Sequence, residues 1–210
     1  MYKRHYMSAP AYGIVTDNAD PDGLGRVKAG LYSLGKDIVT DWMPMLTPSL
    51  GIFFLPEVGD QVVVAFIDDN PDLPIMLGGL WSNVQRPPQT GENAESEFNR
   101  NGKNNLRFVR SRSGNMMVFD DTKGDEKIQL ISASGTVRLE LLSKDSLIRM
   151  VSKGINMSAK GKIRLSGEEC IIKARKGLKA KSENIKVEGR EVNIKAGNSI
   201  AVKGNGINLN

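Results

Sequence analysis

The sequence predicts an all-β protein built from two different bodies. Short segments in which apolar and polar residues alternate run through the chain, and this period of two is typical of half-buried strands. Helical periodicity is absent. All nine prolines lie at or before Pro88 and all aromatic residues at or before Phe119, so the two halves of the 210-residue chain differ in composition.

The first body is expected at residues 11–82, after an N-terminal arm at 1–10. Its apolar segments are short and are separated by Gly, Pro and Asp, which favour turns. Five or six such strands within about 70 residues indicate a small barrel, for which the OB-fold is the commonest compact solution. The strands are expected at residues 12–15, 26–31, 42–46, 52–55, 61–67 and 74–78.

A polar segment, 83–105, is expected to link this barrel to the rest of the chain. It contains Arg86-Pro87-Pro88 and Gly91-Glu92-Asn93, which are turn-forming and solvent-preferring sequences. Strands are expected to resume at residue 106.

Residues 148–210 form the most regular part of the sequence. Apolar pairs such as Ile185-x-Val187 and Val192-x-Ile194 recur roughly every seven to eight residues, and a short fixed period indicates a β-helical or solenoidal array. The apolar stripe is narrow, with a few small side chains per strand. Because ordering the backbone costs roughly 1 to 2 kcal/mol per residue, this stripe cannot make a core within one chain. Partner chains are required.

The composition also limits the compartment and the covalent chemistry. The formal net charge is +5, and the single cysteine, Cys170, excludes an intrachain disulfide framework. No apolar run approaches the roughly 20 residues of a membrane-spanning helix. Residues 1–6 lack the apolar core of a signal peptide, so we expect a chain made in the cytoplasm without one.

Catalytic signals are weak. His5 is the only histidine, which leaves no material for a histidine-based triad or a multi-histidine zinc site. The carboxylate pairs Asp68-Asp69, Asp120-Asp121 and Glu168-Glu169 fall near predicted turns and are interpreted as solvated. Cys170 has no candidate base beside it and is interpreted as a small, partly buried thiol. The sequence therefore predicts no enzyme, no cofactor and no metal.

The turn at residues 18–23 shares part of its spacing with a calcium-binding loop. Asn18-x-Asp20-x-Asp22-Gly23 has the opening spacing of an EF-hand, but position twelve is Ala29, where a bidentate Glu is required. A turn without metal is favoured.

Four blocks of the barrel resemble a known family in order and spacing. They are Asp20-Pro21-Asp22-x-Leu24-Gly25-Arg26-Val27, Trp42, the segment 55–66 and the segment 70–78. Together they are similar to the OB-fold domain of the VgrG and phage baseplate assembly protein V spike family. The matching motif residues are Asp20, Pro21, Gly25, Arg26, Trp42, Pro56, Glu57, Gly59, Asp60, Pro74 and Gly78. Residues 112–128 resemble the segment that leads from that barrel into the family's needle, with Asn115 where the family often has His.

The resemblance implies where the partner chains come from. In this family three chains intertwine their C-terminal strands into a triangular prism. We therefore expect residues 106–147 to be transition strands and residues 148–210 to be an intertwined triple-stranded β-helix, the needle of a homotrimer. The side chains expected around its axis are Ile148, Ile155, Met157, Ile163, Leu165, Ile172, Ile185, Val187, Val192, Ile194, Ile200, Val202, Ile207 and Leu209.

The implied function is that of a central spike in a contractile injection apparatus, assembled into the baseplate of a virion or injection particle. Because the chain begins a few residues before the barrel, the hub is expected to be a separate protein. Some spikes of this family end in an iron-binding His-x-His motif, but no histidine follows His5 in this sequence. A separate PAAR-type tip protein is therefore expected at the C-terminal end. Contact with the target envelope would be transient.

Two other functions were weighed. An OB-fold nucleic-acid binder needs aromatic platforms beside positive charge, and the Lys-rich half contains no aromatic residue. No nucleic-acid partner is therefore expected. A trimeric adhesive or receptor-binding fibre is compatible with the repeats but not suggested by the barrel motifs.

Overall fold

The structure is a computed structural model of the chain and describes residues 9–35, 37–91 and 97–207. The chain divides into two compact units, Met1–Ile155 and Asn156–Asn210. Most of the predicted N-terminal arm and the last predicted axis residue, Leu209, lie outside the described residues. Within the described part the chain is all-β, with helix limited to two 3-10 turns, Ile67–Asp69 and Glu97–Asn99. No helix in this part has the length and apolar character needed to cross a membrane.

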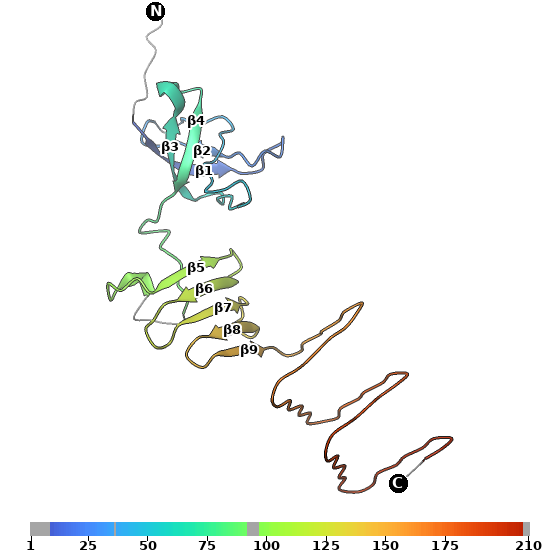
Figure 1. Cartoon of the computed structure of the whole chain (residues 1–210). Coiled ribbons are helices and arrows are strands. Elements are labelled where there is room, and N and C mark those ends of the chain that lie inside the picture. Colours follow the sequence, from blue (N-terminus) through green and yellow to red (C-terminus); the bar gives the residue numbers. More distant parts are fainter. Residues whose placement is uncertain (1–8, 36, 92–96, 208–210) are drawn as a thin grey trace, which may run out of the picture. The chain divides into compact units, whose positions relative to one another are not determined.

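The N-terminal sheet has four antiparallel strands in the order β2-β1-β3-β4 (Figure 1). They are β1 (Ala11–Asp17), β2 (Lys28–Gly30), β3 (Gln61–Phe66) and β4 (Pro74–Gly79). Each lies within one to three residues of a segment predicted from apolar alternation, so these four predictions are confirmed.

The segment around Met43 closes this sheet into a barrel. Met43 forms an antiparallel bridge to Val27 beside β2, and Met45 forms a parallel bridge to Met76 of β4. Backbone hydrogen bonds hold both contacts, with Met43 N to Val27 O at 2.9 Å and Met76 N to Pro44 O at 3.0 Å. The predicted strand at 42–46 is thus present as a pair of bridges that join the two edges.

The barrel core follows the alternation in its strands. In β3, Val62 and Val64 are completely buried while their neighbours are partly exposed. The buried core residues are Ala11, Val15, Val27, Ala29, Leu31, Met43, Val62, Val64 and Met76.

The predicted strand at 52–55 is wrong. No strand is assigned there; Leu50 is fully exposed, and Phe53 and Phe54 are 74% and 64% exposed. Both edges of the barrel sheet are already paired by the Met43 segment, so no edge is left to receive this apolar run. It forms an exposed loop instead.

The second sheet is a five-stranded antiparallel meander in the order β5-β6-β7-β8-β9. Its strands are β5 (Leu106–Arg110), β6 (Met116–Asp120), β7 (Lys127–Ile131), β8 (Arg138–Leu142) and β9 (Leu147–Val151). β9 pairs with β8 along its whole length, so this sheet continues past residue 148, where the needle was expected to begin.

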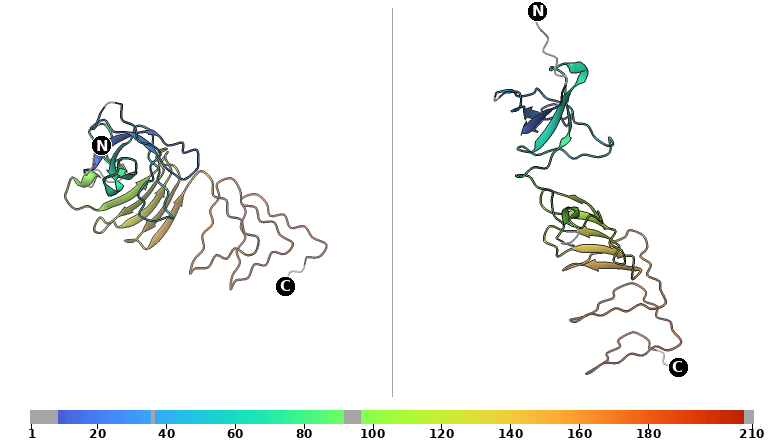
Figure 2. Two further views of the ribbon diagram at one scale, coloured as in Figure 1. Left: turned by 90° about the horizontal axis from the view of Figure 1, so that it is seen from above. Right: turned by 90° about the vertical axis from the view of Figure 1, so that its left-hand side faces the viewer.

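The C-terminal unit contains no assigned strand between residues 156 and 207, and every residue of that range is exposed. Its chain runs in successive wide turns (Figures 1 and 2). The half-buried strands expected here need partner chains, and they stay a prediction for the assembled trimer. No backbone hydrogen bond joins one of these described segments to another, because a single copy offers each segment no neighbouring strand.

Candidate functional site

One face of the β5–β9 sheet is apolar and open. Strand register places Phe119, Ile128, Leu141 and Ile148 in one row across β6 to β9. A second row on the same face is formed by Met117, Leu130, Leu139 and Met150. We call the eight residues of the two rows the open apolar face: Met117, Phe119, Ile128, Leu130, Leu139, Leu141, Ile148 and Met150. Seven of the eight are between 40% and 68% exposed.

The opposite face of the same sheet is largely buried from β6 to β8 and mixes polar side chains with the apolar Val118 and Ile131. Gln129 of β7 donates its amide Nε2 hydrogen to Glu140 Oε1 of β8 at 3.0 Å. Arg149 of β9 adds a longer contact, with Nη1 3.4 Å from Glu140 Oε2. Asp120 and Gln129 are each only 2% exposed. Buried polar side chains need such partners, because an unpaired polar group away from water is costly.

Part of the predicted linker folds against β5. Glu97 is buried, and its Oε1 accepts hydrogen bonds from the backbone N–H groups of Thr90 at 2.7 Å and Gly91 at 2.8 Å. Arg110 of β5 donates from Nη1 to the backbone oxygen of Gln89 at 3.0 Å. Residues 83–105 are therefore more than the polar spacer that the composition suggested.

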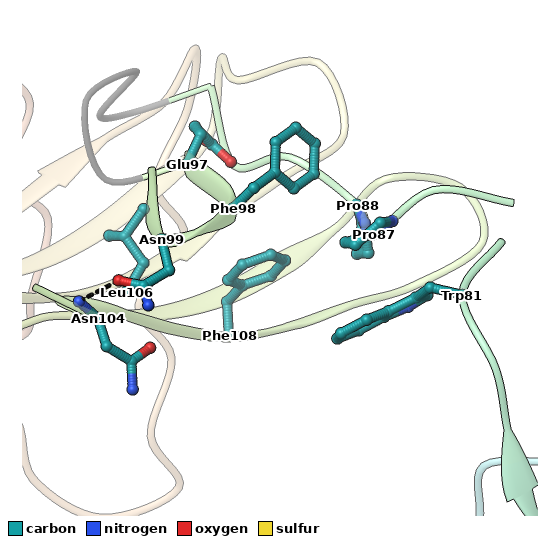
Figure 3. Close-up of a pocket in the computed structure, with 9 residues that line it drawn as sticks. All are labelled: Trp81, Pro87, Pro88, Glu97, Phe98, Asn99, Asn104, Leu106 and Phe108. Atoms are coloured by element: carbon teal, nitrogen blue, oxygen red, sulfur yellow. Dashed lines mark hydrogen bonds between the residues drawn. The ribbon is translucent and has the colours of Figure 1, made fainter. Parts of the chain in front are cut away.

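Apolar groups from the same segment line a pocket next to β5 (Figure 3). Its walls include the rings of Phe98 and Phe108, the paired prolines Pro87 and Pro88, and Trp81 at the end of the barrel segment. These contacts explain why a proline-containing segment stays close to the sheet.

The two faces of this sheet thus differ in burial. The face that mixes polar and apolar side chains is covered, whereas the wholly apolar face is open. Monomeric soluble proteins rarely expose a contiguous apolar patch of more than a few hundred Å². This face is the strongest candidate for a protein–protein interface in the chain.

The predicted axis residues are exposed as well. Ile148 belongs to the open apolar face itself, and Ile155 ends the first unit. The remaining described axis residues lie in the C-terminal unit. All thirteen described members are between 50% and 75% exposed. Sequence reasoning missed the other seven members of the open apolar face, although the alternation in 116–120, 127–131 and 138–142 carries the same signal.

Two predictions about polar groups need correction. Asp120, expected in a solvated turn, is buried at the end of β6, where Lys127 Nζ lies 3.8 Å from its Oδ2. Alternation places Asp120 on the face of Val118, which is covered. Cys170, expected to be partly buried, is exposed, because nothing in one copy covers residues 156–207.

In the barrel, the motif residue Asp20 organises the loop from Asp17 to Val27. Its Oδ2 accepts hydrogen bonds from the backbone N–H of Leu24 at 3.0 Å and from Arg26 Nε at 3.0 Å. Its Oδ1 accepts from the backbone N–H of Asp22 at 3.1 Å and from Arg26 Nη2 at 2.7 Å. The guanidinium of Arg26 also contacts the Asp22 carboxylate, so both motif carboxylates are paired with a side-chain cation.

These contacts perturb both ionisable groups. The hydrogen bonds from the Arg26 side chain, together with those from backbone N–H groups, hold the pKa of Asp20 well below its ordinary value. The same pairing raises the pKa of Arg26 above its ordinary value. Gly25 has a φ of 69°, a conformation that favours glycine. It turns the chain so that the side chain of Arg26 reaches Asp20.

A second motif turn, residues 56–60, joins the loop to β3. Asp60 Oδ2 accepts a hydrogen bond from the backbone N–H of Glu57 at 2.9 Å, and Gly59 at φ 98° donates to Val15 O at 2.8 Å. Gln85 Nε2 donates to Asp60 Oδ1 at 2.7 Å. The Pro56, Glu57, Gly59 and Asp60 motif is thus explained as a tight turn that fixes the register of β3 against β1.

The other motif residues also have structural positions. Trp42 precedes the closing bridge, with Lys28 Nζ 5.0 Å from the centre of one of its rings. Pro74 begins β4 and is buried, and Gly78 lies in β4 opposite Val63, where the register shifts. All these positions build the barrel, and together they occupy the range 20–78.

Comparison with family models gives the decisive match. Residues 11–81 match the model of the type VI secretion system/phage-baseplate injector OB domain. We call this segment the injector OB domain after the model that it matches. The match confirms the resemblance drawn from the motif blocks and supports a spike-associated role in a phage baseplate or an injection particle. A search of the curated proteins found no match.

The Asp20–Arg26 contact should make the injector OB domain sensitive to acid. Because the pKa of Asp20 is lower in the folded state than in the unfolded chain, its contribution to stability is complete above about pH 4. It is lost as the pH falls below that value towards the folded-state pKa. We expect Asp20→Asn to lower the melting temperature at neutral pH and to flatten its fall on acidification, as monitored by tryptophan fluorescence.

The matched control is Asp72→Asn, which removes an exposed carboxylate from another turn of the same domain. It should melt like the unaltered chain. Equal melting curves for both variants at every pH would show that Asp20 does not stabilise the loop.

Proposed function

We propose that the chain forms a homotrimeric central spike of a contractile injection apparatus, such as a phage tail, a tailocin or a related secretion system. Three copies would bury the open apolar face and intertwine residues 148–210 around one axis. The injector OB domain would seat this needle on the tube. The action is mechanical rather than enzymatic: sheath contraction drives the needle into a target envelope.

The observation that carries this proposal is the exposure of the open apolar face and, separately, of the axis residues in the C-terminal unit. Both sets of apolar side chains are left open in a single copy. Other copies of the same chain offer matching apolar stripes in the same register, and closed symmetry leaves no free strand edge. Continuous interchain hydrogen bonds around a dry axis would also make the needle stiff.

A nucleic-acid-binding function is less well supported because its two requirements lie in different units. Exposed aromatic rings, such as Phe53 and Trp81, occur in the first unit. That unit, residues 1–155, has seventeen basic and nineteen acidic residues, and the basic excess lies after it. Stacking platforms and positive charge are not combined as single-strand binding requires. An adhesive fibre remains the second alternative, but the match to the injector OB domain favours a spike.

Light scattering on the purified chain tests the proposal. A homotrimer should give three times the chain mass of 23.0 kDa. A monomer at micromolar concentration would contradict an intertwined needle, because obligate interfaces of this kind leave no stable separate chain.

Two further partners belong to the same proposal: a separate hub protein at the barrel end and a PAAR-type tip protein at the C-terminal end. Neither contact is represented in a structure of one chain. A structure of the assembled particle tests both, and bare solvent beyond Asn210 would contradict the tip protein.

A further inference from the structure

The C-terminal unit carries all of the chain's excess positive charge. Residues 156–207 contain twelve Lys or Arg and five Asp or Glu, whereas residues 1–155 contain seventeen basic and nineteen acidic residues. All twelve basic side chains are exposed. Among the described residues of this unit, the one ion pair joins Lys186 to Glu188. The positive charge is therefore concentrated in one unit and largely uncompensated within it.

Most of the basic residues also alternate with the apolar residues of the repeats. They occupy the positions between or next to the apolar axis residues, as Arg164 does between Ile163 and Leu165. Alternation in an extended chain sends these two sets of side chains to opposite faces. Burying the apolar set around an axis would thus leave the basic set pointing outward.

Three segments carry basic doublets spaced two residues apart. The doublets are Lys162 with Arg164, Lys173 with Arg175, and Lys179 with Lys181. On an extended chain, two residues of a doublet are separated by about 7 Å along the backbone. This distance is within the Debye length of about 8 Å at physiological salt. The two cations of a doublet therefore repel each other, and an anion placed between them relieves that repulsion.

We propose that these outward doublets form a phosphate-binding surface, and that its ligand is the headgroup layer of an anionic phospholipid membrane. This inference rests on the proposed function, since it names the chemistry that the needle meets. Lys and Arg near an anionic lipid surface are attracted individually, and the attraction weakens with salt. Nucleic acid offers phosphates too, but no aromatic residue follows Phe119 to stack on its bases.

The test uses the full chain and sedimentation with vesicles. We expect binding to vesicles of phosphatidylcholine with phosphatidylglycerol, little binding to phosphatidylcholine alone, and release by high salt. The triple variant Lys162→Gln, Lys173→Gln, Lys179→Gln removes one cation from every doublet. It should lower the affinity for the phosphatidylglycerol-containing vesicles about tenfold or more.

The matched control neutralises three exposed lysines of the first unit: Lys103→Gln, Lys123→Gln and Lys144→Gln. It changes the net charge equally and should bind vesicles like the unaltered chain. Equal binding by both triple variants would overturn the doublets as the site. Equal binding to both kinds of vesicle would overturn a phosphate surface in favour of apolar insertion.

Two additional arms separate the sources of phosphate. Inorganic phosphate at high concentration should compete only weakly, because it lacks the multiple contacts of a membrane. Duplex DNA bound more tightly than the anionic vesicles would overturn the membrane assignment. Light scattering on each sample keeps the two proposals distinct: a monomer that binds anionic vesicles contradicts only the trimer, and a trimer that does not bind contradicts only the phosphate surface.

Discussion

The variant Ile194→Asp is expected to lose the mass of a trimer or to melt far below the unaltered chain. Ile194 is the middle member of Val192-x-Ile194-x-Ala196 and is 75% exposed in the single copy. In the proposed needle its side chain faces the axis, so three carboxylates would meet at one level without partners. Each buried, unpaired charge costs several kcal/mol, which exceeds what a narrow apolar stripe contributes at that level.

Lys195→Asp is the matched control, because it introduces the same carboxylate one residue further along. Alternation sends position 195 to the opposite face, where a carboxylate stays in water. This variant should keep the trimer mass and melt close to the unaltered chain. Light scattering and thermal melting measure both variants. If Ile194→Asp keeps its mass and melting temperature, residue 194 does not face an axis.

The injector OB domain was largely predictable because its strands obey local rules. Alternation in 61–67 marks Val62 and Val64, which are fully buried, and the turn motifs around Asp20 and Gly59 lie where the chain reverses. The segment 52–55 was not predictable in the same way. It has an apolar composition suited to a strand, but whether a strand forms depends on a free sheet edge, which is a property of the whole barrel.

The β5–β9 sheet shows a different limit of sequence reasoning. Alternation separates its two faces correctly, but it does not say which face the chain covers. Gln129 and Glu140 are buried together with Val118 and Ile131, while Ile128 and Leu141 on the other face are open. Part of the cover comes from the predicted linker, whose contacts with β5, such as the Arg110–Gln89 hydrogen bond, are long-range and leave no periodic signal.

The needle shows a third limit. Its repeats predict strands, but the hydrogen-bond partners of those strands belong to other copies in the proposed trimer. One chain therefore cannot form them, and residues 156–207 have no assigned strand. The sequence identifies the apolar stripe, and only an assembly can turn that stripe into a core.

Met43→Ala is expected to destabilise the injector OB domain by about 2 to 5 kcal/mol without dissociating the trimer. Met43 is completely buried, and its backbone makes the bridge to Val27 that closes the barrel. Both tryptophans, Trp42 and Trp81, lie in or next to this domain, so their fluorescence during urea unfolding reports on the barrel. The control Leu50→Ala truncates a fully exposed side chain and should change stability by less than about 0.5 kcal/mol.

Light scattering should give the same mass for both variants, because the open apolar face and the repeats are unchanged. A Met43→Ala chain as stable as the control would contradict the closed barrel, whereas a chain that also dissociates would show that the barrel, and not the needle alone, holds the copies together.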